Sequence, residues 1–314
     1  MTKDSRIYVA GHRGLVGSAV LRKLQAEGYT RLLTRTRAQL DLTSQAAVER
    51  FFKREQPEYV FLCAAKVGGI RANASQPADF IRDNLLIQTL ALDAALRHRV
   101  RKLVFLGSAC VYPKFAPQPI REDSLLTAAL EPTNEWYAVA KISGIKMAQA
   151  FRRQHGFNAI SLMPANLYGP GDNFDLESAH VVPALMRKFH EAAASNAPVV
   201  TVWGTGTPRR EFLHVDDLAE ACLFLMLRYE GEEIINVGVG EDVSIGELAE
   251  LLREVVAFQG EIVYDRSKPD GTPRRMLDVT RIRAMGWRPK ISLRDGLEQT
   301  YAWFRKHAPS AERP

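Results

Sequence analysis

Residues 6–17 read Arg-Ile-Tyr-Val-Ala-Gly-His-Arg-Gly-Leu-Val-Gly, a short apolar run that passes through three glycines directly into a helical pattern. Glycines at this spacing also occur in plain turns. Between a strand and a helix, however, they let backbone approach a pyrophosphate, and the helix start offers free N–H groups and a positive dipole end. The stretch therefore predicts a dinucleotide-binding turn formed by Gly11, Arg13, Gly14, Leu15, Val16 and Gly17.

The first half of the chain alternates short β-rich apolar runs with helical patterns. Short strands joined by helices imply right-handed crossovers and a mostly parallel sheet. We therefore predict an α/β protein with a doubly wound parallel Rossmann sheet. Strands are expected at 6–10, 30–33, 59–63, 102–106 and 159–163, and helices at 15–27, 45–55, 77–98 and 134–155.

The second half has a looser rhythm, which predicts a smaller, interleaved α/β substrate domain. After a loop at 170–173, a helix is expected at 180–194, and capping-box spacings at Ser244/Glu247 and Ser292/Asp295 open two more. Further strands are expected at 199–203, 211–215 and 233–237. The predicted domains are 1–169, binding the dinucleotide, with a returning segment at about 211–237, and 170–210 with 238–314, binding substrate.

Composition excludes several classes of protein. The 314 residues carry a net charge of +6 without a dense basic run, so nucleic acid is not an expected partner. No apolar run approaches the roughly 20 residues that span a bilayer, and the polar start is not a signal peptide. Three cysteines, Cys63, Cys110 and Cys222, favour a reducing compartment. We expect a cytoplasmic protein without a membrane or metal site.

The end of the second expected strand indicates which dinucleotide binds. An NAD-binding protein usually carries an acid there to hold the ribose 2′-hydroxyl, but here Arg35 and Arg37 precede the first acid, Asp41. Together with Arg13, these guanidinium groups can bind a 2′-phosphate. The sequence thus predicts NADP(H). Alternatively, both arginines are a solvated strand end.

Tyr137 and Lys141 stand four residues apart in an expected helix, so both side chains can reach one site. A neighbouring cation lowers the pKa of a phenol, and a tuned tyrosine can protonate an alkoxide as a carbonyl is reduced. The same spacing also occurs in ordinary amphipathic helices. Ser108 favours catalysis, because it follows the fourth strand, where open α/β sheets bind ligands.

These residues together resemble the extended short-chain dehydrogenase/reductase superfamily. The resemblance covers nearly the whole chain, since residues 210–217 also look like a segment of that superfamily. It implies that Ser108 and Tyr137 hydrogen-bond the reacting oxygen and that Lys141 binds the nicotinamide ribose.

Six further stretches resemble the GDP-L-fucose synthase family: 64–70, 107–113, 131–135, 166–170, 178–184 and 267–274. Departures are small, with Trp136 in place of proline and Cys63 in place of alanine. The resemblance implies a GDP-sugar substrate, GDP-4-keto-6-deoxy-D-mannose, which is epimerised at C3 and C5 and then reduced at C4 with NADPH. It also implies a homodimer paired through helices such as those expected at 77–98 and 134–155.

Inversion beside a ketone needs a base on one face and an acid on the other. Cys110, two residues past Ser108 on an expected extended strand end, should point to the same side as Ser108 and is the candidate base. His180, opening a helix, is the candidate acid. The alternatives are a small buried thiol and a structural histidine.

The resemblance also implies the remaining contacts. Arg210 suits a diphosphate on chemical grounds, whereas Trp203 could equally belong to a core. The implied substrate residues are Lys188, Trp203, Arg210 and Asp270. The implied cofactor residues, beyond the glycine turn and Arg37, are Asp41, Leu42, Ala64, Ala65, Lys141, Pro164, Ala165, Asn166, Leu167 and His180.

Rival functions stay open on the residues alone. A 4,6-dehydratase should carry Asp-Glu after its Ser or Thr, where this chain has Ala109 and Cys110. A UDP-hexose 4-epimerase usually prefers NAD, contrary to Arg37. A non-catalytic NADP-binding sensor typically loses the Tyr–Lys pair, which is present here.

Overall fold

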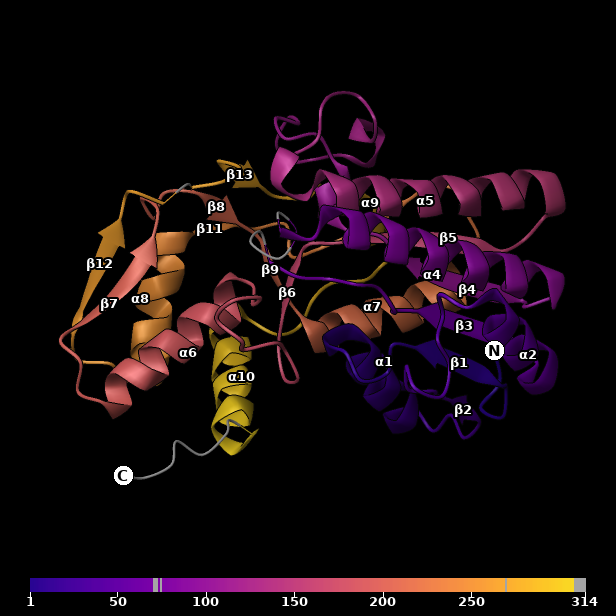
Figure 1. Cartoon of the computed structure of the whole chain (residues 1–314), viewed down its shortest axis with the longest axis horizontal. Helices are drawn as coiled ribbons and strands as arrows, with labels where there is room; N and C mark the ends of the chain where they lie inside the picture. Colours follow the sequence, from indigo (N-terminus) through magenta and orange to yellow (C-terminus); the bar gives the residue numbers. More distant parts are fainter. Residues whose placement is uncertain (70–72, 74, 269, 308–314) are drawn as a thin grey trace.

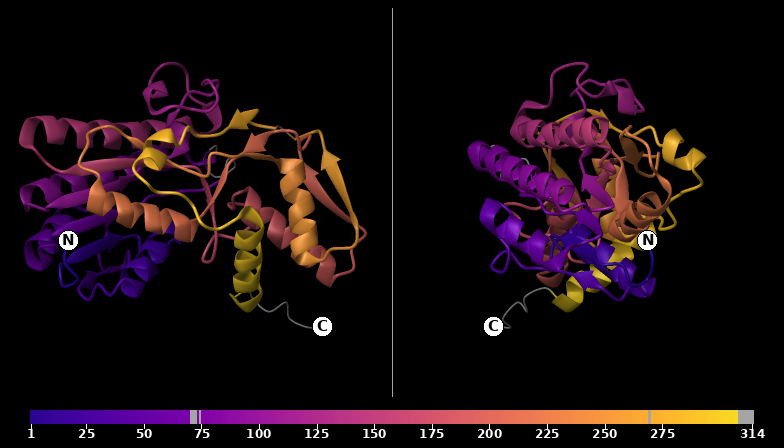
Figure 2. Two further views of the ribbon diagram at one scale, coloured as in Figure 1. Left: turned by 180° about the vertical axis from the view of Figure 1, so that it is seen from behind. Right: turned by 90° about the vertical axis from the view of Figure 1, so that its right-hand side faces the viewer.

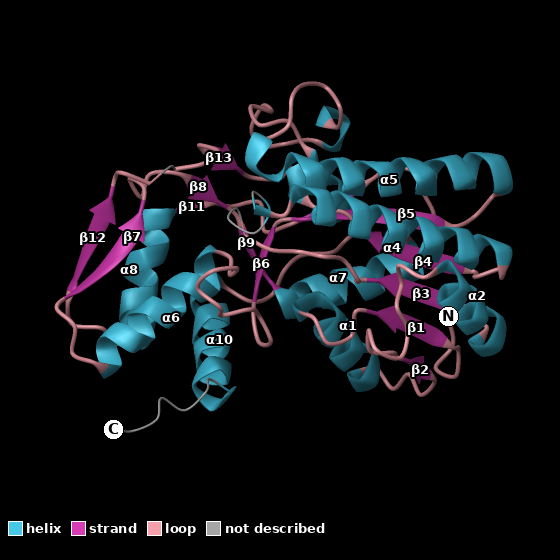
Figure 3. Ribbon diagram, in the orientation of Figure 1, coloured by secondary structure: helices cyan, strands magenta, loops and turns pink. Residues whose placement is uncertain are grey.

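The structure, a computed structural model, describes residues 1–69, 73, 75–268 and 270–307; Ile70 and Pro269 of the quoted stretches lie outside them. Its centre is a six-stranded sheet in which every neighbouring pair is parallel (Figure 3). This confirms the expected α/β fold. In spatial order the strands are β10 (Ile235–Val237), β5 (Ala159–Pro164), β4 (Lys102–Leu106), β3 (Tyr59–Leu62), β1 (Ile7–Ala10) and β2 (Leu32–Leu33).

The strand order reverses between β1 and β3, which places a ligand crevice at the carboxyl ends of these two strands. Two helices packed on each other, α1 (Leu15–Ala26) and α7 (Val215–Arg228), cover one face of the sheet. The other face is covered by α2 (Gln45–Glu55), α4 (Pro77–Arg97) and α5 (Glu135–His155), which pack in that order. The helix α7 was not predicted.

A small lobe lies at the far end of the molecule from α2 (Figures 1 and 2). It contains the two-stranded parallel sheet of β7 (Val199–Trp203) and β12 (Glu261–Asp265), together with α6 (Val181–Ala194), α8 (Ile245–Val256) and α10 (Leu293–His307). These elements share a second cluster of buried side chains, which includes Met186, Phe189, Leu248 and Leu252. In α8 and α10 the predicted Ser244 and Ser292 caps are present.

Short strands form the junction between the large sheet and the small lobe. The junction sheet, as we call it, contains β11 (Val243–Ser244), β8 (Arg209–Arg210) and β13 (Arg274–Arg275). Beside it, β6 (Asn166–Tyr168) pairs in parallel with β9 (Phe212–His214). The remaining short elements are α9 (Thr280–Ala284) and the 3-10 turns η1 (Ala109–Val111), η2 (Glu122–Ser124) and η3 (Pro132–Asn134).

The chain returns to the large sheet more than once. The strand expected at 211–215 is β9, which pairs with β6 instead of extending the six-stranded sheet, whereas β10 from the same returning segment does extend it. Leu277, Val279, Ile282 and Trp287 also belong to the large buried cluster. The proposed domain division remains a prediction. Among the described helices none is long and apolar enough to cross a membrane.

The glycine turn between β1 and α1 depends on close backbone contact. Gly11 adopts a positive φ of 79°, and its carbonyl accepts a hydrogen bond of 2.9 Å from the N–H of Gly14. A Cβ on Gly17 would lie 2.1 Å from that carbonyl oxygen, which no rotamer change can relieve. A Cβ on Gly14 would lie at an ordinary 3.5 Å.

We expect Gly17→Ala to destabilise the protein by about 1–3 kcal/mol, because the turn must open to admit the methyl group. Gly14→Ala is the matched control and should change stability far less. Thermal unfolding without cofactor measures both. Equal melting temperatures for the two variants would contradict this account of the turn.

Candidate active site

The glycine turn fits the pyrophosphate of a dinucleotide. The N-cap of α1, Gly14, has no side chain to satisfy the first N–H groups, and the first turn of the helix carries no acid. Arg13 is exposed beside it. An anion bound here would therefore meet unpaired N–H donors and the positive end of the helix dipole, and no carboxylate of the first turn would compete with it.

The two predicted phosphate-binding arginines are not equivalent. Arg35 forms a 2.7 Å ion pair with Glu55 and donates to the carbonyl of Thr34, so it is already engaged. Arg37 is exposed. Asp41, predicted to contact the cofactor, accepts hydrogen bonds from Thr43, which keep the pKa of the Asp41 carboxyl low. No hydrogen bond or ion pair of the Arg37 guanidinium is found within the described residues, in contrast to Arg35.

The other predicted cofactor residues lie on the same edge of the sheet. Ala64 and Ala65 follow β3 after Cys63, and a Cβ on Gly11 would lie 2.9 Å from Ala64 Cα, so the two backbones touch. Pro164 ends β5, and Ala165 donates to the carbonyl of Val237 at 2.9 Å. The remaining predicted members of this edge are Leu42, which follows Asp41, and Asn166 and Leu167 in β6.

Ser108, Tyr137 and Lys141 come together at the carboxyl end of β4. Ser108 lies near enough to Tyr137 to lower the pKa of its phenol, and Lys141 lies one helical turn further along α5. The Lys141 Nζ donates to the carbonyl of Leu106 at 2.7 Å and lies 5.8 Å from the centre of the Tyr137 ring. Burial lowers the pKa of Lys141 to about 8.

Groups around Tyr137 act on the pKa of its phenol in opposite directions. Burial raises the pKa of the phenol, the charge of Cys110 raises it further, and only the hydrogen bond with Ser108 lowers it. The Lys141 ammonium donates to the carbonyl of Leu106 and is not among the groups that lower the pKa of Tyr137. Tyr137 is therefore a protonated hydrogen-bond donor here.

Cys110 reaches the site by a route that differs from the expected one. The strand β4 ends at Leu106, and Ser108 caps a 3-10 turn, η1, with its Oγ accepting from the Cys110 N–H at 3.2 Å. The thiol accepts hydrogen bonds from Asn134 Nδ2 at 3.3 Å and from Arg275 Nη1 at 3.4 Å. The expectation of an extended strand end was wrong, but Cys110 still joins Ser108 and Tyr137.

His180 stands apart from this cluster. It is the N-cap of α6, its side chain is exposed, and within the described residues it forms no side-chain hydrogen bond. The surrounding protein lowers the pKa of His180 by desolvation, which favours the neutral ring. The structure does not bring His180 into contact with Ser108, Cys110 or Tyr137.

One of the predicted substrate residues lies in the junction sheet, and the other three lie at or near β7. Arg210 lies in the junction sheet, where burial, reinforced by the charge of Arg275, lowers its pKa to about 10. Trp203 is 54% exposed, which excludes the core alternative, and Lys188 Nζ lies 5.3 Å from its ring centre. Asp270 accepts from the Thr205 N–H at 2.7 Å.

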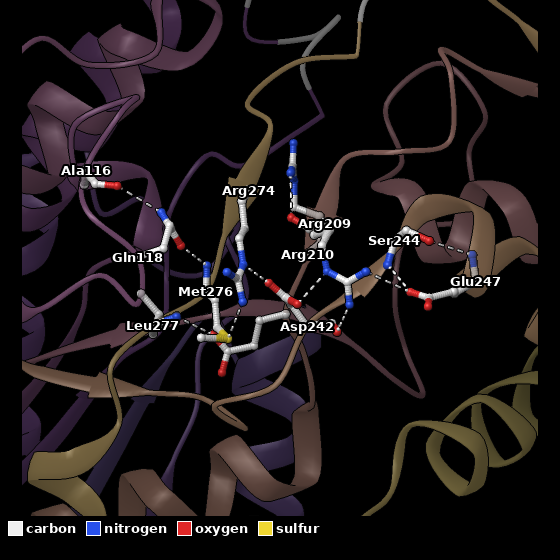
Figure 4. A network of polar contacts seen from close by, with 11 residues as sticks. Ala116, Gln118, Arg209, Arg210, Asp242, Ser244, Glu247, Arg274, Met276 and Leu277 are labelled. Carbon is white, nitrogen blue, oxygen red and sulfur yellow. Dashed lines mark hydrogen bonds and ion pairs between the residues drawn. The ribbon is translucent and has the colours of Figure 1, made fainter.

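Two residues that contact the thiol were missed as site residues, Asn134 and Arg275. Asn134 lies within a quoted stretch, but no role was assigned to it. The alternation of side chains along a strand could have identified Arg275. Neighbouring residues of a strand point to opposite faces, so one arginine of Arg274-Arg275 had to turn inward. Figure 4 shows that Arg274 and Arg209 meet at Asp242, whereas Arg210 points away from it.

Comparisons with known proteins agree with this geometry. The profile of the NAD dependent epimerase/dehydratase family matches residues 7–238. GDP-L-fucose synthase 1 of Arabidopsis thaliana is 63% identical over 97% of this chain and 94% of its own length. A GDP-6-OMe-4-keto-L-xylo-heptose reductase from C. jejuni is 38% identical, with a TM-score of 0.93 over 98% of this chain and 99% of that one.

A GDP-L-fucose synthetase from Naegleria fowleri bound to NADP has a TM-score of 0.92 and is 28% identical, covering 100% of this chain and 98% of that one. The likeness thus spans both lobes and the junction, not the glycine turn alone. It confirms the resemblance found in the sequence. The chain belongs to the NAD dependent epimerase/dehydratase family and, within it, to the GDP-L-fucose synthases.

Proposed function

We propose that this chain converts GDP-4-keto-6-deoxy-D-mannose into GDP-L-fucose, by epimerisation at C3 and C5 and NADPH-dependent reduction at C4. The observation that carries the proposal is that Ser108 and Cys110 both lie near enough to Tyr137 to act on its pKa, with the Ser108 Oγ accepting from the Cys110 N–H. A ketone held by the two hydroxyls acidifies the protons on both neighbouring carbons. The adjacent thiol can remove those protons.

Each residue has a separate role in this scheme. Cys110, as a thiolate, takes the proton from C3 or C5, and the charge moves to the ketone oxygen, where Ser108 and Tyr137 donate hydrogen bonds. His180 returns a proton to the opposite face, which inverts the carbon. In the reduction, Tyr137 donates its proton to the C4 oxygen. One oxyanion site thus serves three steps.

The residues present also fit NADP(H). NADPH, when bound, supplies the hydride for C4. Gly11, Gly14 and Gly17 with the uncapped start of α1 would hold the pyrophosphate, and Arg37 would hold the 2′-phosphate. Lys141, at the carboxyl end of β4, would bind the nicotinamide ribose. Lys188, Trp203, Arg210 and Asp270 would bind the GDP moiety and the sugar hydroxyls.

Two broader expectations belong to the proposal. A homodimer would pair through α4 and α5, and Leu86 of α4 is 38% exposed for such a contact. A cytoplasmic location suits the chemistry, because a catalytic thiol must stay reduced and Cys63, Cys110 and Cys222 are all free. Sedimentation of the purified protein tests the dimer.

Incubation with NADPH and GDP-4-keto-6-deoxy-D-mannose, followed by identification of the product sugar, tests the function directly. We expect GDP-L-fucose and one NADPH oxidised per product. If NADPH is oxidised but the product retains the D-manno configuration at C3 and C5, the protein is a simple C4 reductase instead.

Tyr137→Phe removes the proton donor for the C4 oxygen and leaves the ring in place. We expect the rate of NADPH oxidation to fall by about 10²–10⁴-fold. The affinity for NADPH, measured by titration of NADPH fluorescence, should be unchanged. Undiminished turnover would exclude Tyr137 as the proton donor.

Cys110→Ser and His180→Gln should each slow the uptake of solvent deuterium at C3 and C5, since one variant lacks the base and the other the acid. Mass spectrometry of the recovered sugar measures the exchange. Affinity for NADPH is the control and should not change. A variant that exchanges at the parent rate would remove its residue from the proposed role.

Arg37→Gln should weaken NADPH binding by about 10–100-fold, the contribution expected from a charge-assisted hydrogen bond of 1.5–3 kcal/mol. NADH binding should change little, because NADH lacks the 2′-phosphate. Arg35→Gln is the control, since Arg35 is paired with Glu55. Equal losses for both dinucleotides would contradict the assignment of Arg37.

A further inference from the structure

The Cys110 sulfur is held from two directions. Asn134 Nδ2 reaches it at 3.3 Å from η3, just before α5, and Arg275 Nη1 reaches it at 3.4 Å from β13 in the junction sheet. Both groups are N–H donors, and one carries a full positive charge. Hydrogen bonds from such donors favour a thiolate over a thiol.

The register of the junction sheet directs Arg275 inward. In the parallel pairing of β13 with β8, Arg275 stands opposite Arg210 and Arg274 opposite Arg209. The outer pair, Arg209 and Arg274, shares the carboxylate of Asp242 (Figure 4). The inner pair, Arg210 and Arg275, lies on the Cys110 side, and no ion pair of either member with a carboxylate is found within the described residues.

A chain of contacts orients the Arg275 guanidinium. Its Nη2 donates to Thr272 Oγ1 at 3.4 Å, and the Thr272 hydroxyl donates to Glu131 at 3.2 Å. Glu131 is buried and forms a 3.1 Å ion pair with Lys114. Because Glu131 is already paired, its charge does not pull Arg275 away from the thiol.

Charged and titratable groups face Cys110 from each element packed around it. These are Arg275 of β13, Arg210 of β8, Tyr137 of α5 and, beyond Thr272, Glu131 before η3. Tyr137 is neutral and Glu131 is neutralised by Lys114. Among these groups, Arg275 is the cation in hydrogen-bond contact with the sulfur.

We propose that Arg275 is the positioning residue that holds Cys110 as the thiolate base of the epimerisation, with Asn134 as the second donor. The role rests on the function proposed above. When the thiolate takes a proton from carbon, an S–H bond forms and the enolate charge moves to the oxygen held by Ser108 and Tyr137. Arg275 itself exchanges no proton.

The test measures the state of the thiol without substrate. The rate of Cys110 alkylation by iodoacetamide is followed against pH in the parent, Arg275→Gln and Arg275→Lys proteins. The midpoint should rise by about 1–3 pH units in Arg275→Gln, as expected for the loss of an opposite charge in contact. Arg275→Lys should recover part of that rise. Deuterium uptake near pH 7 should fall about tenfold for each unit of rise.

Arg274→Gln is the matched control, since it removes a neighbouring charge from the outer face of the same strand. Its alkylation profile should superimpose on that of the parent. Cys110→Ser gives the background, which should be low because burial raises the pKa of Cys63 to about 12 and also raises that of Cys222.

An unshifted midpoint in Arg275→Gln would overturn the proposal. If Arg275→Gln does not fold, Asn134→Ala and Arg275→Lys must each shift the midpoint upward, and parent-like profiles for both would equally overturn it. A parent protein that makes no GDP-L-fucose would refute the proposed function, yet the alkylation profiles would still decide the role of Arg275.

Discussion

The buried carboxylate of Glu211 joins the segments on which the site depends. Its two oxygens accept from the N–H groups of Gly240 at 2.6 Å and Leu277 at 2.8 Å. Its own N–H donates to the carbonyl of Arg275 at 3.3 Å, and its carbonyl accepts from Asn166 at 3.0 Å. Burial raises the pKa of Glu211, whereas the backbone donors lower it. Sheet edge, junction and return strand therefore meet at one residue, through both its main chain and its side chain.

The Rossmann half was predictable because its signals are local. A strand, three glycines and the start of a helix occupy residues 6–17, and the contact of Gly17 with the Gly11 carbonyl closes the same turn. The Ser244 cap and the Tyr137–Lys141 spacing are also local. Each depends on residues separated by fewer than about seven positions, so periodicity and capping rules suffice.

The rest of the site depends on contacts that the sequence does not place. Arg35 and Arg37 look alike in the sequence, but only tertiary packing brings Glu55 to Arg35. The contact between Arg275 and Cys110 joins residues 165 positions apart. The turn after β4, which replaces the expected strand end, depends on the Ser108 cap and not on any apolar pattern.

The arginine pairs of the junction sheet bear on what fixes the register between β8 and β13. Both β8 and β13 read Arg-Arg, so a slip by one residue would still present a guanidinium to each face. Side-chain identity cannot discriminate against that slip. Hydrogen bonds to the main chain of this segment do so instead. The N–H of Glu211 donates to the carbonyl of Arg275, the Glu211 carboxylate accepts from the N–H of Leu277, and the N–H of Arg209 donates to the carbonyl of Pro273 at 2.8 Å. A carboxylate remote from the chemistry thus decides which of two identical residues faces the sulfur.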